Sequence, residues 1–273
     1  MSSEKDVILV TGGNTGLGWE IVRALAGTST AYEIIVGCRT VSKGEEAISS
    51  VKQAQPSTTS SFSTLQVDLS SDSSLEKAVE SITSRYGRLD VLVNNGGGSF
   101  DQDIASGRSS IRDAFNKSWD TNVSGTHVLT TLAIPLLLKS YDPRLLFITS
   151  GTASVTETEK MDTEMQKRLN ASPPAGWPKP AAGLNNTAYR SSKTGLNMLM
   201  REWRRLLLND GVKVWAISPG FLATGLAGAG AEKLKQMGAL DPSIGGEFVK
   251  DVIQGRRDEH VGKIIRKSEI QPW

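Results

Sequence analysis

A tyrosine and a lysine stand four residues apart in Tyr189-Arg190-Ser191-Ser192-Lys193. On a helix, positions i and i+4 share one face, so we expect Lys193 beneath Tyr189 with its charge near the phenolic oxygen. A phenol ionises at a pKa of about 10, which is too high for efficient proton transfer at neutral pH. A positive charge about 4 Å away, at an effective dielectric of about 20, is worth roughly 4 kcal/mol, or about three pK units. The pair therefore predicts a tyrosine that transfers protons near physiological pH.

A glycine-rich segment, Thr-Gly-Gly-Asn-Thr-Gly-Leu-Gly at residues 11–18, follows an apolar run at residues 7–10. Gly12 can adopt the positive φ that the turn needs. Gly16 and Gly18 let the backbone and the next helix approach a pyrophosphate at the helix N-terminus. A strand, this loop and a helix in succession predict a dinucleotide site beside Tyr189.

Short apolar runs alternate with helical patterns along the chain. Strands are expected at residues 7–10, 34–37, 65–67, 89–93, 145–148, 212–217 and 263–265, and helices at 17–26, 43–52, 75–86, 118–138 and 189–208. Buried parallel strands are continuous apolar runs, and this alternation is typical of a doubly wound sheet. Ser73 and Glu76 fit a capping box at the start of the third helix, and the Ser/Thr-rich stretch 56–63 is expected to be a connection. The pattern predicts a single α/β domain over residues 1–273.

The composition excludes several kinds of partner. Lys and Arg total 31 against 29 Asp and Glu, and the net charge of +2 is dispersed, so no nucleic-acid partner is expected. Cys38 is the only cysteine, and His127 and His260 lie far apart, so we expect no disulfide and no metal site. No apolar run approaches the roughly 20 residues that cross a bilayer, and the polar start predicts no signal peptide. The sequence therefore predicts a cytoplasmic protein with no membrane partner.

These features occur in the order found in the short-chain dehydrogenase/reductase family, which the chain resembles from Val7 to Thr224. The glycine segment has the family spacing Thr-Gly-x-x-x-Gly-x-Gly, and residues 94–97, Asn-Asn-Gly-Gly, match the family's Asn-Asn-Ala-Gly turn. Gly96 departs from the usual alanine. Further matching positions are Asp68, Asn122, Ser150 and residues 219–224. The resemblance implies a single-domain, Rossmann-like, seven-stranded and mostly parallel sheet with helices on both faces.

The resemblance also implies roles for single residues. In the family, hydride moves between a nicotinamide and a carbonyl or alcohol carbon, while the tyrosine matched by Tyr189 transfers the proton. Ser150 matches the serine that binds the substrate oxygen, Lys193 the lysine that binds the nicotinamide ribose, and Asn122 the asparagine that anchors this lysine through water. The implied catalytic residues are Asn122, Ser150, Tyr189 and Lys193. The implied cofactor-binding residues are Gly12, Asn14, Thr15, Gly16, Leu17, Gly18, Arg39, Asp68, Leu69, Asn95, Gly96, Tyr189, Lys193, Pro219, Gly220, Leu222 and Thr224.

The end of the second strand indicates which cofactor the chain uses. An acidic residue there binds the ribose 2′-hydroxyl of NAD, whereas a basic residue accepts the 2′-phosphate of NADP. Cys38 stands where an aspartate would select NAD, and the guanidinium of Arg39 suits a phosphate. We therefore expect NADP(H). Asp68, which matches the family aspartate at the adenine ring, could instead cap a turn.

The stretch between Ser150 and Tyr189 is longer than is usual in the family and resembles the insertion of the carbonyl-reductase branch. The expected insertion loop, residues 153–187, would lie beside the substrate pocket and against a surface where many relatives pair, which slightly favours a monomer over a homo-oligomer. Trp177 either lines this pocket or pins the loop to the surface. Residues 221–242, rich in Gly and Ala, are expected to form a mobile substrate lid.

The sequence thus predicts an NADP(H)-dependent oxidoreductase acting on a carbonyl or alcohol carbon of a small, apolar substrate. Two alternatives remain: a redox-silent NADP(H)-binding sensor or partner protein, and a biosynthetic reductase of an imine or quinone. The set of Ser150, Tyr189 and Lys193 disfavours the sensor, because a sensor needs no proton donor. Five apolar residues either line an apolar substrate pocket or pack in the core: Phe100, Leu184, Phe221, Leu222 and Met237.

Overall fold

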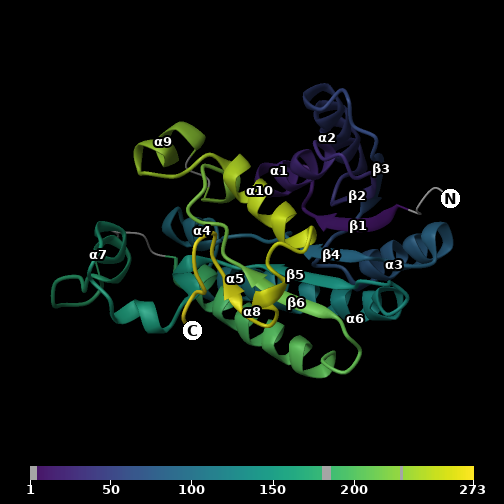
Figure 1. The fold of residues 1–273 in the computed structure, drawn as a ribbon. Helices are drawn as coiled ribbons and strands as arrows, with labels where there is room; N and C mark the ends of the chain where they lie inside the picture. The colour runs from purple at the N-terminus through teal and green to yellow at the C-terminus, as the bar shows by residue number, and fades with distance from the viewer. Residues whose placement is uncertain (1–4, 180–185, 228–229) are drawn as a thin grey trace.

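The computed structural model describes residues 5–179, 186–227 and 230–273 (Figure 1). Within these ranges, seven strands form one sheet in the order β3-β2-β1-β4-β5-β6-β7, and all neighbouring pairs are parallel. The strands are β1 (Asp6–Thr11), β2 (Tyr32–Cys38), β3 (Ser61–Gln66), β4 (Val91–Asn94), β5 (Arg144–Ile148), β6 (Lys213–Ile217) and β7 (Ile264–Ile265). The predicted seven-stranded, doubly wound sheet is confirmed.

Helices cover both faces of the sheet (Figure 1). One face packs against α1 (Gly16–Ala26), α2 (Val41–Ala54) and α10 (Pro242–Ile253), with Ile8, Ile34 and Trp215 buried between. The other face packs against α3 (Asp72–Tyr86), α6 (Gly125–Leu137) and α8 (Thr187–Leu206), with Leu9, Leu92 and Phe147 buried between. Consecutive strand residues therefore enter opposite cores, as the period of two in a strand requires. The fold is Rossmann-like, as expected.

Two local expectations at the third strand and helix are wrong. β3 begins at Ser61, inside the stretch expected to be a connection, and most of its residues are only half-buried. An edge strand of this kind has few apolar residues, so the Ser/Thr-rich composition of this stretch did not indicate a strand. α3 begins at Asp72, after the N-cap Ser71, whose hydroxyl accepts a hydrogen bond from the Ser74 N–H at 3.4 Å. The predicted capping box of Ser73 and Glu76 is therefore wrong, and the helix is capped two residues earlier, at Ser71.

The single helix expected over residues 118–138 is a composite. It consists of α5 (Ile111–Trp119), a π-helical turn η1 (Asp120–Ser124) and α6, and the short α4 (Asp101–Ala105) precedes it. The π turn contains Asn122, which is fully buried. Single π turns inserted in α-helices occur often at functional sites. The interruption therefore falls on a predicted site residue.

The expected insertion loop, residues 153–187, contains helical structure. It includes the end of η2 (Gly151–Ala153), η3 (Thr156–Glu159) and α7 (Glu164–Asn170). A capping box starts α7: the Thr163 hydroxyl accepts from the Gln166 N–H at 3.1 Å, and the Gln166 side chain accepts from the Thr163 N–H at 2.9 Å. That Thr-x-x-Gln signal is visible in the sequence. Trp177 is 87% exposed, so among the described residues it neither lines a pocket nor pins the loop, and Leu184 lies outside the described residues.

In the expected lid, residues 221–242, the first residues are hydrogen-bonded to Leu240 near its end. The Ala223 N–H donates to the Leu240 carbonyl at 2.9 Å, and the Leu240 N–H donates to the Phe221 carbonyl at 2.8 Å. Ala223, Leu234 and Ala239 form a small buried cluster with Phe221 packed against it. These four apolar side chains thus pack on one another, whereas Leu226 and Leu240 are exposed. The remaining short elements are η4 (Gly225–Ala227), α9 (Ala231–Gln236) and η5 (Asp258–His260).

Candidate active site

The strand order reverses between β1 and β4, so the carboxyl ends of these two strands form the topological switch point of the sheet. Thr11, the last residue of β1, joins them there. Its hydroxyl donates to the Val93 carbonyl at 3.2 Å and accepts from the N–H groups of Asn95 and Gly96 at 3.0 and 2.8 Å. The Asn95 side chain in turn donates to the Thr11 carbonyl at 2.8 Å. The glycine loop and the Asn-Asn-Gly-Gly turn are therefore hydrogen-bonded into one unit at the ends of β1 and β4.

The glycine loop has the geometry that a dinucleotide site needs. Gly12 and Gly16 have φ angles of +61° and +53°, which side chains rarely adopt. A Cβ on Gly18 would lie only 2.1 Å from the Gly12 carbonyl oxygen, so the helix packs directly on the loop backbone. Asn14 and Thr15 lie at the outer part of the loop, half-buried and exposed respectively. The loop therefore confirms the predicted strand, turn and helix in sequence.

The residues around the N-terminus of α1 fit a pyrophosphate. Within the described chain, the first turn of α1 carries no acidic residue, and the Thr15 side chain makes no capping hydrogen bond. The first N–H groups of the helix can then bind an anion, which the helix dipole favours. The segment at residues 219–224 lies close by, because a Cβ on Gly16 would meet Thr224 at 3.4 Å. Leu17, Pro219 and Leu222 meet around Gly245.

The departure of Gly96 from the family's alanine has a steric reason. A Cβ at this position would lie 3.0 Å from Cδ1 of Leu69 and 3.2 Å from the Thr11 hydroxyl. Leu69 is buried and cannot easily withdraw. A methyl group at position 96 would press on two neighbours, so glycine suits this version of the turn.

Arg39 and Asp68 lie together beyond the ends of β2 and β3. The Arg39 side chain is exposed, whereas Cys38 is 3% exposed and directs its thiol to the Thr40 carbonyl at 3.1 Å. Hydrogen bonds from the Ser70 hydroxyl and N–H lower the pKa of Asp68, and the nearby charge of Arg39 adds to this effect. Asp68 therefore caps the turn at Ser70, which is the alternative role considered for it above. Arg39 exposes its guanidinium to solvent beside Asp68.

Ser150 and Tyr189 lie near each other. Ser150 follows β5, and its hydroxyl shares a hydrogen bond with the Thr152 hydroxyl at 2.9 Å. Burial raises the pKa of Tyr189 to about 12, and the nearby Ser150 side chain opposes this rise. The expectation of a pKa near neutrality is therefore wrong for the chain by itself. Tyr189 is a protonated phenol at physiological pH.

Lys193 lies one turn below Tyr189 on α8, as the spacing predicts. Its side chain is 5% exposed, its Nζ lies 5.9 Å from the centre of the Tyr189 ring, and it donates to the Ile148 carbonyl at 2.8 Å. Burial lowers the pKa of Lys193 to about 8. The ammonium thus remains mostly charged at neutral pH but is directed at a strand carbonyl.

Asn122 connects the loop after β4 to α8. Its side chain accepts from the Gly98 N–H at 2.8 Å and donates to the Gly98 carbonyl and the Ser192 hydroxyl, both at 2.9 Å. A Cβ on Gly97 would lie 2.7 Å from the Asn122 amide oxygen and 3.4 Å from Lys193 Nζ. Glycine at position 97 therefore leaves space between Asn122 and Lys193. All four predicted catalytic residues lie in one region.

Sequence reasoning missed two residues of this region. Asp101 is 4% exposed and binds the first turn of α8, although it lies 87 and 88 residues from its partners. Arg190 donates to the Thr152 carbonyl at 2.9 Å, the Leu169 carbonyl at 3.2 Å and the Asn170 side chain at 3.3 Å. It thereby joins α8, the serine loop and α7. Neither contact has a local sequence signal, because each depends on which segments pack together.

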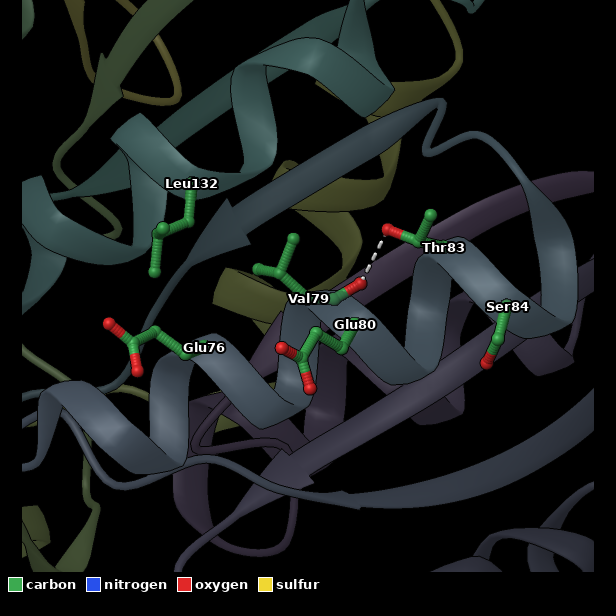
Figure 2. Close-up of a pocket in the computed structure, with 6 residues that line it drawn as sticks. All are labelled: Glu76, Val79, Glu80, Thr83, Ser84 and Leu132. Atoms are coloured by element: carbon green, nitrogen blue, oxygen red, sulfur yellow. Dashed lines mark hydrogen bonds between the residues drawn. The ribbon is translucent and has the colours of Figure 1, made fainter.

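A shallow groove elsewhere on the surface is not part of this region. Figure 2 shows it between α3 and α6, with Val79 and Leu132 facing each other and the carboxylates of Glu76 and Glu80 at its rim. None of the predicted site residues lines it. The described residues contain no cluster of His, Cys, Asp or Glu suited to a metal ion and no helix long and apolar enough to cross a membrane.

Comparisons with known proteins agree with this geometry. The family model for short chain dehydrogenases matches residues 6–161 and 180–235. The chain is 46% identical over 278 residues to the short-chain dehydrogenase/reductase eupG of Phoma sp, with 98% of both chains covered, and 42% identical to tropE of Talaromyces stipitatus, with 99% of both covered. A crystal structure of NADPH-bound carbonyl reductase from chicken fatty liver has a TM-score of 0.77 at 19% identity, covering 99% of this chain and 100% of that one.

Both the sequence match and the arrangement of the site point to one family. The matched ranges contain the glycine loop, Ser150, Tyr189 and Lys193, and the sheet order is that of a doubly wound dinucleotide fold. The chain therefore belongs to the short-chain dehydrogenase/reductase family and is an oxidoreductase that uses a nicotinamide cofactor.

Proposed function

We propose that the protein is an NADP(H)-dependent reductase of a carbonyl carbon, or the corresponding alcohol dehydrogenase, with Tyr189 as general acid and base. The observation that carries the proposal is the position of the Tyr189 phenol, which burial keeps protonated, near the Ser150 side chain and one helical turn from the buried ammonium of Lys193. A phenol whose pKa is raised to about 12 is protonated at neutral pH and is a weak acid, so it can give its proton to a more basic oxygen such as the alkoxide that hydride transfer would form. This state suits the reductive direction.

The residues of the chain divide the work. When bound, the nicotinamide cofactor supplies or accepts the hydride. The Ser150 hydroxyl would donate to the substrate oxygen and stabilise the negative charge that develops there, an effect worth about 3 kcal/mol in comparable sites. Tyr189 would give the same oxygen its proton. Lys193 and the turn held by Asn122 would bind the ribose and keep a positive charge under the phenol.

Two observations support NADP(H) over NAD(H). Arg39 exposes its guanidinium at the end of β2, where the ribose phosphate of NADP would lie. Cys38, in the position of the NAD-selecting aspartate, turns its thiol inward and offers no acceptor to a ribose hydroxyl. The remaining cofactor contacts are assigned to the glycine loop, Asn95, Gly96, Leu69, Asp68 and residues 219–224. The lid role of residues 221–242 and a substrate pocket beside the insertion belong to the same proposal.

The test uses NADPH that carries deuterium at the pro-S position of the nicotinamide C4. The protein is incubated with this cofactor and a panel of ketones, imines and quinones, and products are searched for deuterium by mass spectrometry. A deuterated alcohol is the expected product. Label found only in an amine, or an unlabelled hydroquinone formed as NADPH is consumed, would favour the biosynthetic alternative. Tight NADPH binding without transfer to any member of the panel would favour the redox-silent sensor.

A further inference from the structure

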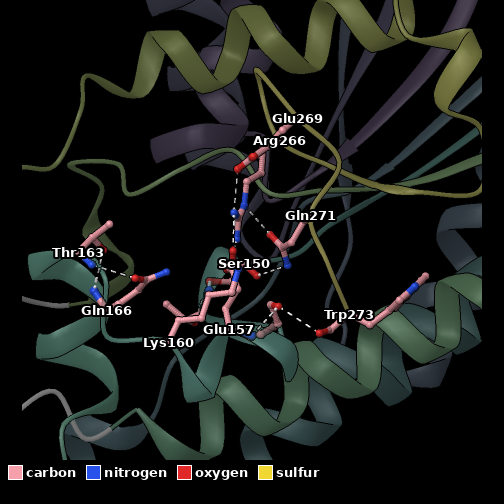
Figure 3. A network of polar contacts seen from close by, with 12 residues as sticks. Ser150, Glu157, Lys160, Thr163, Gln166, Arg266, Glu269, Gln271 and Trp273 are labelled. Carbon is pink, nitrogen blue, oxygen red and sulfur yellow. Dashed lines mark hydrogen bonds and ion pairs between the residues drawn. The ribbon is translucent and has the colours of Figure 1, made fainter.

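The chain returns to the serine loop at its last described residues. After β7, residues 266–273 fold back along that strand, with an antiparallel bridge between Ile265 and Ile270. The Gln271 N–H donates to the Ile264 carbonyl at 2.9 Å. Figure 3 shows Gln271 between Arg266 and Ser150. This segment, which we call the C-terminal tail, thus lies against the edge of the candidate active site.

Gln271 contacts the backbone of Ser150. Its side chain is buried at 2% exposure, and its Nε2 donates to the Ser150 carbonyl at 3.2 Å while its Oε1 accepts from Arg266 Nε at 3.1 Å. Arginine has only donors and a carbonyl only accepts, so these two partners fix which end of the amide faces Ser150. The Ser150 carbonyl also accepts from the Ala153 N–H at 3.1 Å. Both lone pairs of that carbonyl are therefore used.

The rest of the tail holds the segment that follows Ser150. The Arg266 guanidinium forms an ion pair with both carboxylate oxygens of Glu157 and a further one with Glu269 at 3.0 Å. The carbonyl of Trp273 accepts from the Ser154 hydroxyl at 3.1 Å and from the Thr156 N–H. Figure 3 follows this network from Glu269 to Trp273. Residues 150–157 are therefore anchored to the tail at both ends.

We propose that Gln271 is a positioning residue for Ser150, acting through the serine's backbone carbonyl. Ser150 lies between β5 and a single 3-10 turn, so hydrogen bonds to its carbonyl restrain the backbone that places its Cβ, while the Thr152 N–H holds its hydroxyl at 3.2 Å. The contribution to turnover rests on the proposed function. The anchoring of the loop does not, and it can be measured separately.

The test compares Gln271→Glu with Gln254→Glu. Glu at position 271 keeps the size of the side chain and can still accept from Arg266, but it turns an acceptor toward the Ser150 carbonyl in place of a donor. Gln254 is the matched control, because it is partly buried and donates a side-chain hydrogen bond, to the Tyr32 hydroxyl at 3.4 Å, away from the site. Amide hydrogen exchange of peptides covering residues 150–157 reports the loop without any substrate.

The expected result has two parts. Gln271→Glu speeds exchange over residues 150–157 and lowers kcat about tenfold, because a misplaced donor stabilises the transition state less. The NADPH Kd and the KM of the carbonyl substrate stay within about twofold of wild type, since the glycine loop is untouched. Gln254→Glu matches wild type in both measurements.

Three outcomes would overturn the proposal. Unchanged exchange in Gln271→Glu would mean that the tail does not hold the serine loop. Faster exchange with unchanged kcat would mean that holding the loop does not position the Ser150 hydroxyl. Equal losses in both variants would mean general destabilisation. A wild-type protein that reduces no substrate would contradict the proposed function instead, and the exchange measurement would still decide whether Gln271 anchors the loop.

Discussion

The carboxylate of Asp101 accepts a hydrogen bond from the backbone N–H of Tyr189 at 3.0 Å. Its second oxygen accepts from the Ala188 N–H at 2.8 Å. The helix's own N-cap residue, Asn186, provides no side-chain cap, so within the described residues Asp101 caps α8 from another element. A buried carboxylate is stabilised there by the two N–H groups and by the positive end of the helix dipole. The phenol-bearing residue is thereby tied to the short helix α4, which follows the β4 loop.

Removing the Asp101 carboxylate should destabilise the protein. Asp101→Ala leaves two buried N–H groups without acceptors, and we expect it to lower the free energy of unfolding by about 1–3 kcal/mol. Asp101→Asn keeps one acceptor and should recover part of that loss. Asp103→Ala is the control: it removes an ion pair with Arg108 that is largely exposed, which is worth at most about 1 kcal/mol. Denaturant unfolding measures all three, and equal losses at positions 101 and 103 would contradict the capping role.

Tyr189→Phe should separate binding from chemistry. The substitution keeps the ring and removes only the hydroxyl, so we expect NADPH affinity to change little and turnover to fall about 10²–10⁴-fold. Stopped-flow hydride transfer and fluorescence titration of NADPH measure the two effects. Tyr141→Phe, at a fully exposed tyrosine, is the control. Turnover retained in Tyr189→Phe would show that another group donates the proton.

The pKa of Lys193 predicts an alkaline limit to activity. Burial lowers this pKa to about 8, so the ammonium is charged below pH 8 and neutral above it. The kcat/KM for NADPH reports ionisations of the free enzyme, and we expect it to decline as pH rises through about 8. Lys193→Arg stays charged and should lose this decline even if its turnover is lower. A profile that is flat between pH 7 and about 9 in the wild type would rule out Lys193 as the titrating group.

Arg39→Ala should weaken NADPH binding selectively. Loss of a charge-assisted contact to the ribose phosphate is expected to raise the NADPH Kd about 10- to 100-fold and to leave the NADH Kd nearly unchanged. Arg112→Ala, at an exposed arginine of α5, controls for the loss of one surface charge. Titration by isothermal calorimetry measures both cofactors. Equal weakening of NADPH and NADH would assign Arg39 no part in cofactor choice.

The ion pair between Arg266 and Glu157 makes the anchoring of the C-terminal tail sensitive to acid. Hydrogen bonds from Arg266 lower the pKa of Glu157 below its usual 4.5. A lowered carboxyl pKa contributes stability that is present above pH 4.5 and lost as pH falls through the folded-state value. The difference in unfolding free energy between wild type and Glu157→Gln should therefore be larger at pH 6 than at about pH 3. A difference that is equal at both values would contradict the ion pair.

The layered architecture follows from local patterns. Val7 to Val10 and Leu145 to Ile148 are continuous apolar runs because both faces of a central parallel strand are buried, and such runs are visible in one dimension. The edge strand β3 is half-buried, so Ser61 to Gln66 carry no such run. The sequence interpretation placed α7 in a loop, although Thr163 and Gln166 have the spacing of a capping box.

The chemistry of the site divides in the same way. The glycine loop and the spacing of Tyr189 and Lys193 were determined by the sequence, because each is a short-range pattern within one turn or one helix face. Only the tertiary structure decided that Asp101 caps the helix of Tyr189, 88 residues away, and that Gln271 contacts Ser150 from 121 residues away. It also decided that the pKa of Tyr189 is raised rather than lowered from its ordinary value. Burial and long-range contacts depend on which surfaces pack together, and no local spacing encodes that packing.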